Sequence, residues 1–311
     1  MARRYSLTFL LTILLILPLI SIEANTGYHA LRQPLYARAV GMNGAFTGQA
    51  GDASAVNWNP AGLFSIDGLS GQISYQKHLV DVNATELLSA FPVWKGGLAV
   101  GLYYWDYGNF DQRNSQGAII GDPVSAYEGW LSAGYGMEIS KDISIGASVQ
   151  LFQRDYADNR STVLFYSAGV QRYFPQQDLR IGFALSRWGR VLDSWLESPE
   201  PYPNQIMAGL TKQLAHLPLQ LFMDGEYDIH TEGFRGKVGG EFTITESENL
   251  FLRFGLTTDR FDQQTEVVGA DFFAGTSFGF GVRVSPIQID YGTQTFGGAG
   301  MIHSVTVRWG M

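Results

Sequence analysis

The histidines are the first side chains to consider for chemistry, because an imidazole can bind a metal or act as a general base. The sequence has five, at positions 29, 78, 216, 230 and 303, and their spacing matches no metal-ligand pattern. His303 and Ser304 are neighbours, but successive side chains of a strand point to opposite faces and cannot act on one substrate together. The sequence therefore predicts no enzyme, no metal and no cofactor.

Charged side chains form the second group with possible chemistry. In the C-terminal half they alternate with apolar residues, as in Asp224, Glu226 and Asp228. We expect one ladder of lumen-facing charges on neighbouring strands, made of Asp224, Glu226, Asp228, Arg235, Lys237, Arg253 and Arg283. Such a ladder is either a polar permeation path or a set of ion pairs that links the strands of the wall and holds a plug. The second interpretation is favoured.

The elements that must position these charges are strands. After residue 68 the chain alternates with period two, as in Ile143, Ile145, Ala147 and Val149. Fourteen segments of this kind are predicted, at 69–77, 84–93, 96–106, 126–138, 142–153, 162–173, 178–187, 204–213, 218–229, 234–244, 249–258, 274–284, 286–294 and 301–310. An even number of strands with about 9–11 residues each suits a transmembrane β-barrel.

The connections between these segments support the same architecture. Every second connection is short, as at 95–96, 140–141 and 285–286, whereas the long stretches 107–125 and 188–203 fall between them. Outer-membrane barrels have short periplasmic turns and long external loops. We therefore predict an all-β protein, a transmembrane antiparallel barrel of fourteen strands, at residues 69–311.

The N-terminus and the composition set the location. Arg3 and Arg4 precede an apolar stretch that ends near Ala24, which predicts a signal peptide at residues 1–24. The chain has no cysteine, 21 basic and 29 acidic residues, and a net charge of −8, which argues against nucleic acid as a partner. The expected location is the cell outer membrane, with membrane lipids as partners.

Residues 25–68 do not alternate and are rich in small side chains, so we expect a small N-terminal hatch, or plug, in the barrel mouth. Asp52 can cap a short helix, and Asn59 before Pro60 predicts a tight turn. Three stretches carry a resemblance to a known family: Ala37 to Met42, Asp52 to Ala55, and Trp58 to Leu63.

These stretches resemble the N-terminal signature of the PorV/PorQ family, which is related to the FadL-type transporters of the OMPP1/FadL/TodX superfamily. The motif covers about thirty residues. The pattern of strands and connections extends the resemblance over nearly the whole chain after the signal peptide. The resemblance implies a FadL-like barrel with a hatch that contains Asn59, Pro60 and Ala61. It also implies one of two functions: type IX protein secretion or envelope assembly, with secreted proteins or secretion subunits as partners, or uptake of hydrophobic molecules.

The sequence leaves these functions open. Secretion or envelope assembly is the first hypothesis, transport of a hydrophobic ligand is the alternative, and a purely structural barrel is the third. Transport would require an apolar pocket between hatch and wall, for which we expect Phe46, Trp58, Trp105 and Trp130. A lumen filled with salt bridges would count against it.

Overall fold

The computed structural model describes residues 28–157, 159–195, 202–244, 249–261, 263 and 271–310. The expected signal peptide at residues 1–24 lies outside this part of the chain. Within it, no helix is long and apolar enough to cross a membrane.

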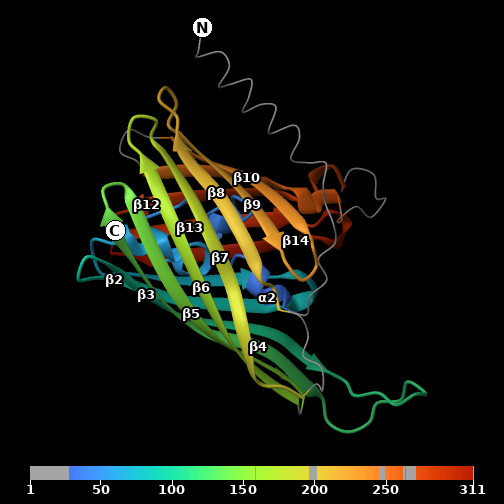
Figure 1. Cartoon of the computed structure of the whole chain (residues 1–311). Coiled ribbons are helices and arrows are strands. Elements are labelled where there is room, and N and C mark those ends of the chain that lie inside the picture. Colours follow the sequence, from blue (N-terminus) through green and yellow to red (C-terminus); the bar gives the residue numbers. More distant parts are fainter. Residues whose placement is uncertain are drawn as a thin grey trace.

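Fourteen antiparallel strands form one closed barrel, in which each strand pairs with its neighbours in sequence and β1 pairs with β14 (Figure 1). This confirms the predicted fold. The strands are β1 Ser70–Lys77, β2 Asn83–Val93, β3 Gly96–Phe110, β4 Val124–Ser140, β5 Ile143–Tyr156, β6 Asn159–Phe174, β7 Leu179–Asp193, β8 Gln205–Gln213, β9 Leu219–Asp228, β10 Phe234–Thr243, β11 Leu250–Thr257, β12 Thr276–Val284, β13 Ile287–Thr295 and β14 Met301–Trp309.

Alternation along each strand gives the barrel an apolar outside. Leu131 is 56% exposed and Leu252 is 51% exposed, whereas the inward Phe152 and Arg253 are 0% and 3% exposed. Because the ring is closed, every ladder hydrogen bond of the backbone is made between strands, as a bilayer requires. The outer face therefore meets lipid, and the polar side chains face the bore.

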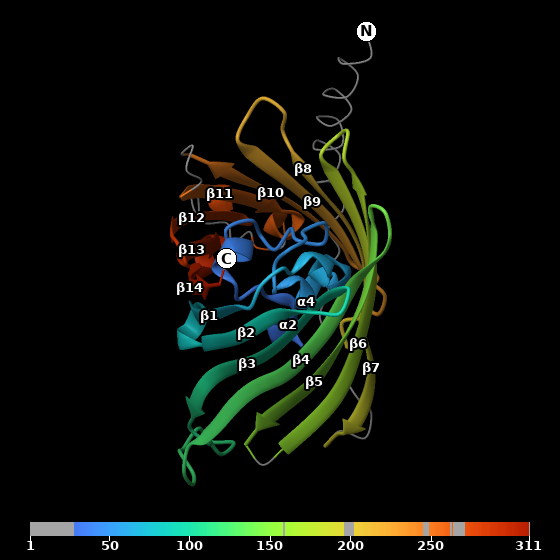
Figure 2. The ribbon, with the colours of Figure 1, turned by 90° about the vertical axis from the view of Figure 1, so that its left-hand side faces the viewer.

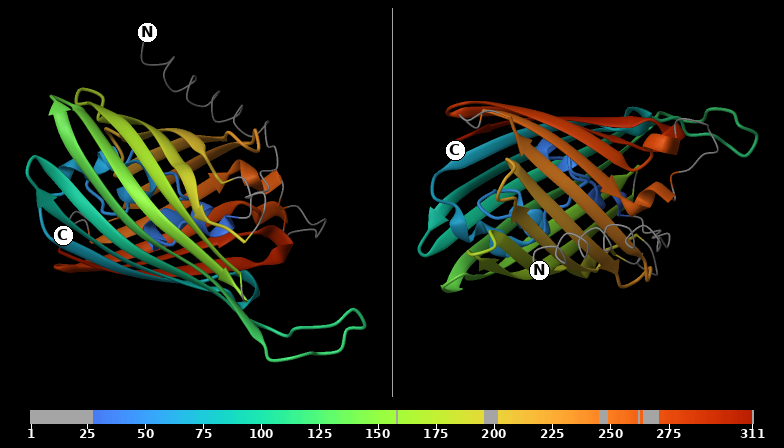
Figure 3. Two further views of the ribbon diagram at one scale, coloured as in Figure 1. Left: turned by 60° about the horizontal axis from the view of Figure 1, so that its bottom comes forward. Right: turned by 90° about the horizontal axis from the view of Figure 1, so that it is seen from above.

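The two ends of the barrel differ. At one, which we name the turn end, strands are joined by short turns such as Trp94–Lys95, Lys141–Asp142 and Ser285–Pro286. At the other, the loop end, residues 111–123 form a hairpin that projects away from the barrel (Figure 3). The predicted alternation is therefore present in part: three loop-end connections are long, at 111–123, 194–204 and 258–275, whereas those at 78–82, 157–158, 229–233 and 296–300 are as short as the turns.

Five strands, β3 to β7, are two to five residues longer than predicted, and all five extend at the loop end. Strands β3 to β7 have 15, 17, 14, 16 and 15 residues, whereas β8 to β14 have between 8 and 10. A bilayer crossing needs about 9–11 residues. The surplus residues form a wall, here named the tall wall, that extends past the other strands (Figure 2). Part of each predicted loop, 107–125 and 188–203, is thus strand.

The N-terminal segment, residues 28–68, lies inside the barrel, where strands surround it in the view of Figure 2. It contains three short helices and one 3-10 helix: α2 His29–Arg32, α3 Ala37–Val40, α4 Ala55–Trp58 and η2 Pro60–Ser65. Tyr36, Ala39 and Val40 have no exposed surface. Tyr28 lies in the loop half of the bore, against Phe152 and Phe165, and the segment enters β1 at the turn end.

A row of glycines lets this segment lie directly on the wall. Gly97, Gly136, Gly146 and Gly169 are successive cross-strand partners on β3 to β6. A Cβ atom at Gly146 would lie 2.3 Å from the carbonyl carbon of Pro60, and one at Gly136 would lie 2.3 Å from the Pro60 oxygen. Side chains at these positions would push the segment away from the sheet, so the glycine row makes room for η2.

Replacing Gly146 with Ala tests this fit. The new methyl group would overlap the backbone of Pro60, so we expect the N-terminal segment to be displaced at a cost of about 1–3 kcal/mol. Limited proteolysis of the folded barrel should then cut the segment faster than in the wild type. Gly225→Ala is the matched control, because its Cβ would first meet the ring of Phe234 at 3.3 Å. Equal protection of Gly146→Ala and wild type would contradict the role of the glycine row.

Candidate functional site

Asn59 fixes the turn that the sequence singles out. Its Nδ2 lies 3.2 Å from the Thr47 carbonyl oxygen, 3.3 Å from that of Val170 on β6 and 3.4 Å from that of Phe183 on β7, and donates to them. Its Oδ1 accepts a hydrogen bond from the Ala61 amide at 3.1 Å. Asn59 thus joins two parts of the segment to two strands, and Pro60 and Ala61 follow on the glycine row.

Asp224 on β9 holds the opposite side of the segment. Its Oδ2 accepts hydrogen bonds from the Phe46 amide at 2.8 Å, the Thr47 amide at 2.9 Å and the Thr47 hydroxyl at 2.7 Å. Carboxylate acceptors give stronger hydrogen bonds than neutral groups. This member of the predicted charge ladder therefore binds the N-terminal segment and not another strand.

A network of ion pairs, here named the ionic network, joins the segment to strands β10 to β14. Arg38 donates to both carboxylate oxygens of Glu241 at 2.8 Å and to Asp52 at 3.1 Å. Arg253 lies 2.6 Å from Glu241 and 2.7 Å from Asp290, and Arg308 lies 3.2 Å from Asp290. These charges are buried, and a buried ion pair is strongly destabilising when one partner is lost.

Asp52 belongs to this network and lies in the N-terminal segment. Burial by itself would raise the pKa of its carboxyl group, but the positive charges of Arg308 and Arg38 and the hydrogen bonds from Ser54 lower it below the ordinary value of 3.8. Asp52 is therefore ionised at neutral pH.

The other predicted ladder residues lie on the same side of the bore. Lys237 lies 2.5 Å from Glu226, and Arg235 lies 3.3 Å from Glu226 and 2.7 Å from Asp259. Asp228 pairs with Arg32 of the segment. Arg283 donates to Gln288 at 3.0 Å and lies over the ring of Phe251. We name the inner face of β9 to β14 the ionic side.

The opposite inner face, on β2 to β6, is aromatic. A buried cluster combines wall residues with the first residues of the segment: Tyr28, Ala30, Leu31, Leu35, Ala84, Tyr103, Trp105, Trp130, Phe152, Val163 and Phe165. Tyr103 and Trp130 stack with ring centres 4.7 Å apart, and Phe152 meets Phe165 edge-on. Because strand residues with the opposite phase face lipid, these rings are turned toward the bore. We name this cluster the aromatic side.

The structure does not bring the four expected pocket residues into one pocket. Trp105 and Trp130 belong to the aromatic side. Phe46 and Trp58 belong to a separate cluster, in which Phe46 stacks on Phe222 of β9 with ring centres 6.0 Å apart. The two clusters approach each other at the central pocket, which Trp58 and Trp130 both line.

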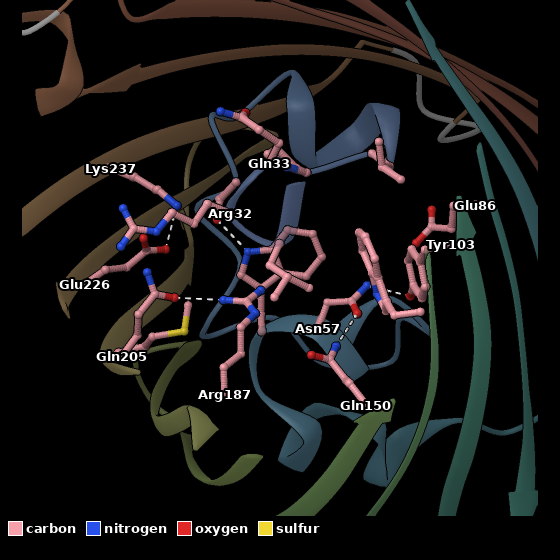
Figure 4. Close-up of a pocket in the computed structure, with 17 residues that line it drawn as sticks. Arg32, Gln33, Asn57, Glu86, Tyr103, Gln150, Arg187, Gln205, Glu226 and Lys237 are labelled. Atoms are coloured by element: carbon pink, nitrogen blue, oxygen red, sulfur yellow. Dashed lines mark hydrogen bonds and ion pairs between the residues drawn. The ribbon is translucent and has the colours of Figure 1, made fainter. Parts of the chain in front are cut away.

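The central pocket is a small cavity of about 40 Å³ between the ionic and aromatic sides. Figure 4 shows Glu226 and Lys237 entering it from one side and Glu86 and Tyr103 from the other. Arg187 donates to Gln205 at 2.8 Å.

Polar contacts extend across the aromatic side of the central pocket. Asn57 of the segment donates to the Tyr103 hydroxyl at 2.7 Å, and Gln150 donates to Asn57 at 3.3 Å. Apolar surface is supplied by Leu31, Leu35, Trp58, Trp130 and Met207. The pocket thus places apolar surface beside polar donors, but its volume is far below the 300–1,000 Å³ that is typical of small-molecule sites.

Several residues of these sites were not predicted. Arg187 has a positive φ of 58° and lies where the pairing of β6 with β7 is irregular, between Tyr166 and Ala168. The sequence carries no signal for this irregularity. Phe152 and Phe165 fit the strand pattern, but their facing positions depend on the register between β5 and β6.

The sequence also contains one serine motif that is typical of a nucleophile. Gly275-Thr276-Ser277-Phe278-Gly279 matches the pattern of a nucleophile elbow, which requires a sharp turn from a strand to a helix. Ser277 lies instead within strand β12 and is fully buried. Among the described residues, no group of three His, Asp or Glu side chains could hold a metal ion.

Comparison with known proteins identifies the fold. No family model and no curated protein sequence matches the chain. Among solved structures it is similar to the Pseudomonas putida toluene transporter TodX, with a TM-score of 0.62 and 11% identity over 88% of this chain and 97% of that one. A Pseudomonas aeruginosa FadL homologue gives 0.57 and 11% over 93% and 99%. The CymD monoaromatic hydrocarbon channel gives 0.61 and 11% over 88% and 97%. The shared feature is the FadL-like barrel.

Asn59→Asp tests the turn. The carboxylate would face three carbonyl oxygens that now accept from Nδ2, and a buried acceptor without a donor is costly, by about 1–3 kcal/mol. We expect Asn59→Asp to lower the temperature at which the N-terminal segment becomes sensitive to proteolysis. The decrease should be larger than for Asn59→Ala. An Asp variant as stable as the Ala variant would show that these contacts contribute little.

Asp52 predicts a pH dependence. A carboxyl group whose pKa is lower in the folded state stabilises that state above its unfolded pKa, near 3.8, and loses this effect as the pH falls through the folded pKa. The difference in thermal midpoint between wild type and Asp52→Asn should therefore be constant from pH 7 to about pH 5 and shrink below pH 4. A difference that is unchanged at pH 2 would contradict this.

Proposed function

We propose that this chain is an outer-membrane channel that takes up hydrophobic small molecules at the loop end. The observation that carries the proposal is the aromatic side of the lumen. It places Trp130, Phe152 and Phe165 around the first residues of the N-terminal segment, next to the central pocket. Apolar and aromatic walls with a few placed polar groups are typical of small-molecule sites.

The ion pairs of the lumen do not rule out such a path, because most of them are separated from the aromatic side. Asp224, Glu226, Glu241 and Asp290 lie on β9, β10 and β13, whereas the aromatic cluster lies on β2 to β6. The exception is Glu128, which lies 3.8 Å from Arg154 at the loop end of β4 and β5. We therefore assign holding of the segment to the ionic side and contact with the ligand to the aromatic side.

The proposal includes an orientation. The loop end would face the cell exterior and the turn end the periplasm, as short and long connections are arranged in outer-membrane barrels. Residues 25–68 would act as the hatch, after removal of a signal peptide at residues 1–24, and residues 69–311 would form the barrel. The similar solved structures include a toluene transporter and a monoaromatic hydrocarbon channel, which supports a hydrophobic ligand.

Type IX secretion or envelope assembly, suggested by the PorV/PorQ-like motif, is the second candidate. The observation that favours it is the tall wall with its projecting hairpin. Phe110, Ile119 and Ile120 are 51%, 58% and 47% exposed there. Apolar side chains on an external projection suit contact with another protein, such as a secreted substrate or a secretion-system subunit.

Trp130→Ala separates the two candidates. Loss of this ring should slow cellular uptake of radiolabelled toluene or oleate by about threefold to tenfold, which corresponds to about 0.7–1.4 kcal/mol of binding. Leu131→Ala is the control, because Leu131 is the next residue of β4 and faces lipid.

Uptake of both probes that is normal in a deletion strain would contradict the transport proposal. If the same strain also fails to secrete proteins into the medium, the second candidate takes its place. A deletion strain with slow uptake and normal secretion is the result that the transport proposal predicts.

A further inference from the structure

Three polar atoms of the residues that line the central pocket have no partner. Nε of Arg187, Nε1 of Trp130 and Oε1 of Gln150 are buried and form no hydrogen bond within the described part of the chain. Arg187 and Gln150 are drawn among the lining side chains in Figure 4. A buried polar atom without a partner is costly, because it has lost its hydrogen bonds to water and gained none. Together the three atoms indicate a missing polar group.

The volume of the central pocket limits the size of that group. The cavity measures about 40 Å³, and a cavity must have about 10–15 Å³ to hold one water molecule. The central pocket therefore has room for about three non-hydrogen atoms. This is enough for the polar end of a ligand but not for an aromatic ring.

The charges around the central pocket are balanced. Arg32 and Lys237 are each paired with a carboxylate of β9. Arg187 donates to a glutamine and has no ion pair within the residues that the structure describes, and the same holds for Glu86, which accepts from a serine and a glutamine. The charges of Arg187 and Glu86 are opposite and cancel, so the site as a whole favours a neutral group.

A hydroxyl group matches the three unpartnered atoms. It has one donor and two acceptor lone pairs, so it can donate to Gln150 Oε1 and accept from Arg187 Nε and Trp130 Nε1. A methyl group would satisfy none of the three atoms. A carboxylate could accept from Arg187 and Trp130, but it has no proton to donate to Gln150.

The aromatic side is the surface that the rest of such a ligand would contact. Leu31, Leu35 and Trp130 belong both to the lining of the central pocket and to the aromatic cluster. We propose that the central pocket binds the hydroxyl group of a neutral hydrophobic ligand, an alcohol or a phenol. This inference rests on the proposed function and names the chemical class of its ligand.

Benzyl alcohol and ethylbenzene test the inference, because they differ only in the exchange of a hydroxyl group for a methyl group of similar size. Uptake of each radiolabelled compound is measured in wild-type cells and in a deletion strain, and the difference is the uptake that depends on this protein. At limiting concentration this uptake should favour benzyl alcohol by about threefold to tenfold.

Trp130→Phe keeps an aromatic ring and removes the N–H donor. It should lower the ratio of benzyl alcohol to ethylbenzene uptake by about threefold. Trp188→Phe is the matched control, because Trp188 is 44% exposed and does not line the central pocket. Folding of each variant is checked by its heat-dependent shift on a denaturing gel.

The outcomes separate this inference from the proposed function. Equal protein-dependent uptake of the two compounds, or an unchanged ratio in Trp130→Phe, would overturn the hydroxyl site and leave the transport proposal intact. Preferential uptake of benzoate over both compounds would also overturn it, because the pocket would then accept an anion. If uptake of no compound depends on the protein, the transport proposal is wrong and this inference is wrong with it.

Discussion

Backbone amides in a bilayer have no water to bind, so a chain that crosses as strands must close into a ring. In this chain fourteen strands satisfy that constraint, with β1 paired to β14. A ring of this size encloses more space than wall side chains alone can fill. The N-terminal segment occupies that space, and its own polar groups must then find partners inside the bore. The segment is held against the wall at the glycine row, by Asn59 and by Asp224.

The two sides of the lumen follow from this arrangement. The ionic side fixes the segment through Arg38, Asp52 and their partners, and ion pairs of this kind need precise geometry to be favourable. The aromatic side packs against the first residues of the segment, at Tyr28, Leu31 and Leu35, and accepts a hydrogen bond from Asn57 at the Tyr103 hydroxyl. The segment therefore separates a central pocket next to aromatic rings from a second cavity at the turn end, which is lined by both arginine and carboxylate side chains.

The sequence predicts the barrel well because its signals are local. Alternation in stretches such as Ile143 to Val149, and the short turns between them, specify strand number and orientation without any tertiary information. The predicted strands are shorter than β3 to β7 because residues such as Gly108 and Asn109 interrupt the apolar pattern, although they still pair with β4 beyond a bulge.

The sites are harder to predict because they depend on long-range register. Asn59 contacts the carbonyl groups of Val170 and Phe183, which are more than a hundred residues away in the sequence. The residues next to Asn59 in the sequence do not indicate these partners. The charge ladder was expected from alternation alone, but not that Asp224 would bind backbone amides of the segment. The motif around Asn59 and Pro60 pointed to the segment without showing which strands hold it.

We propose that residues 28–68 close the bore to ions, and electrical recording tests this most directly. Purified protein in a planar lipid bilayer should show no steady ion conductance, because the segment is packed against the wall on both the glycine row and the ionic side. A chain that lacks residues 28–68 should give open-channel steps. A steady, ohmic conductance from the intact chain would contradict the account.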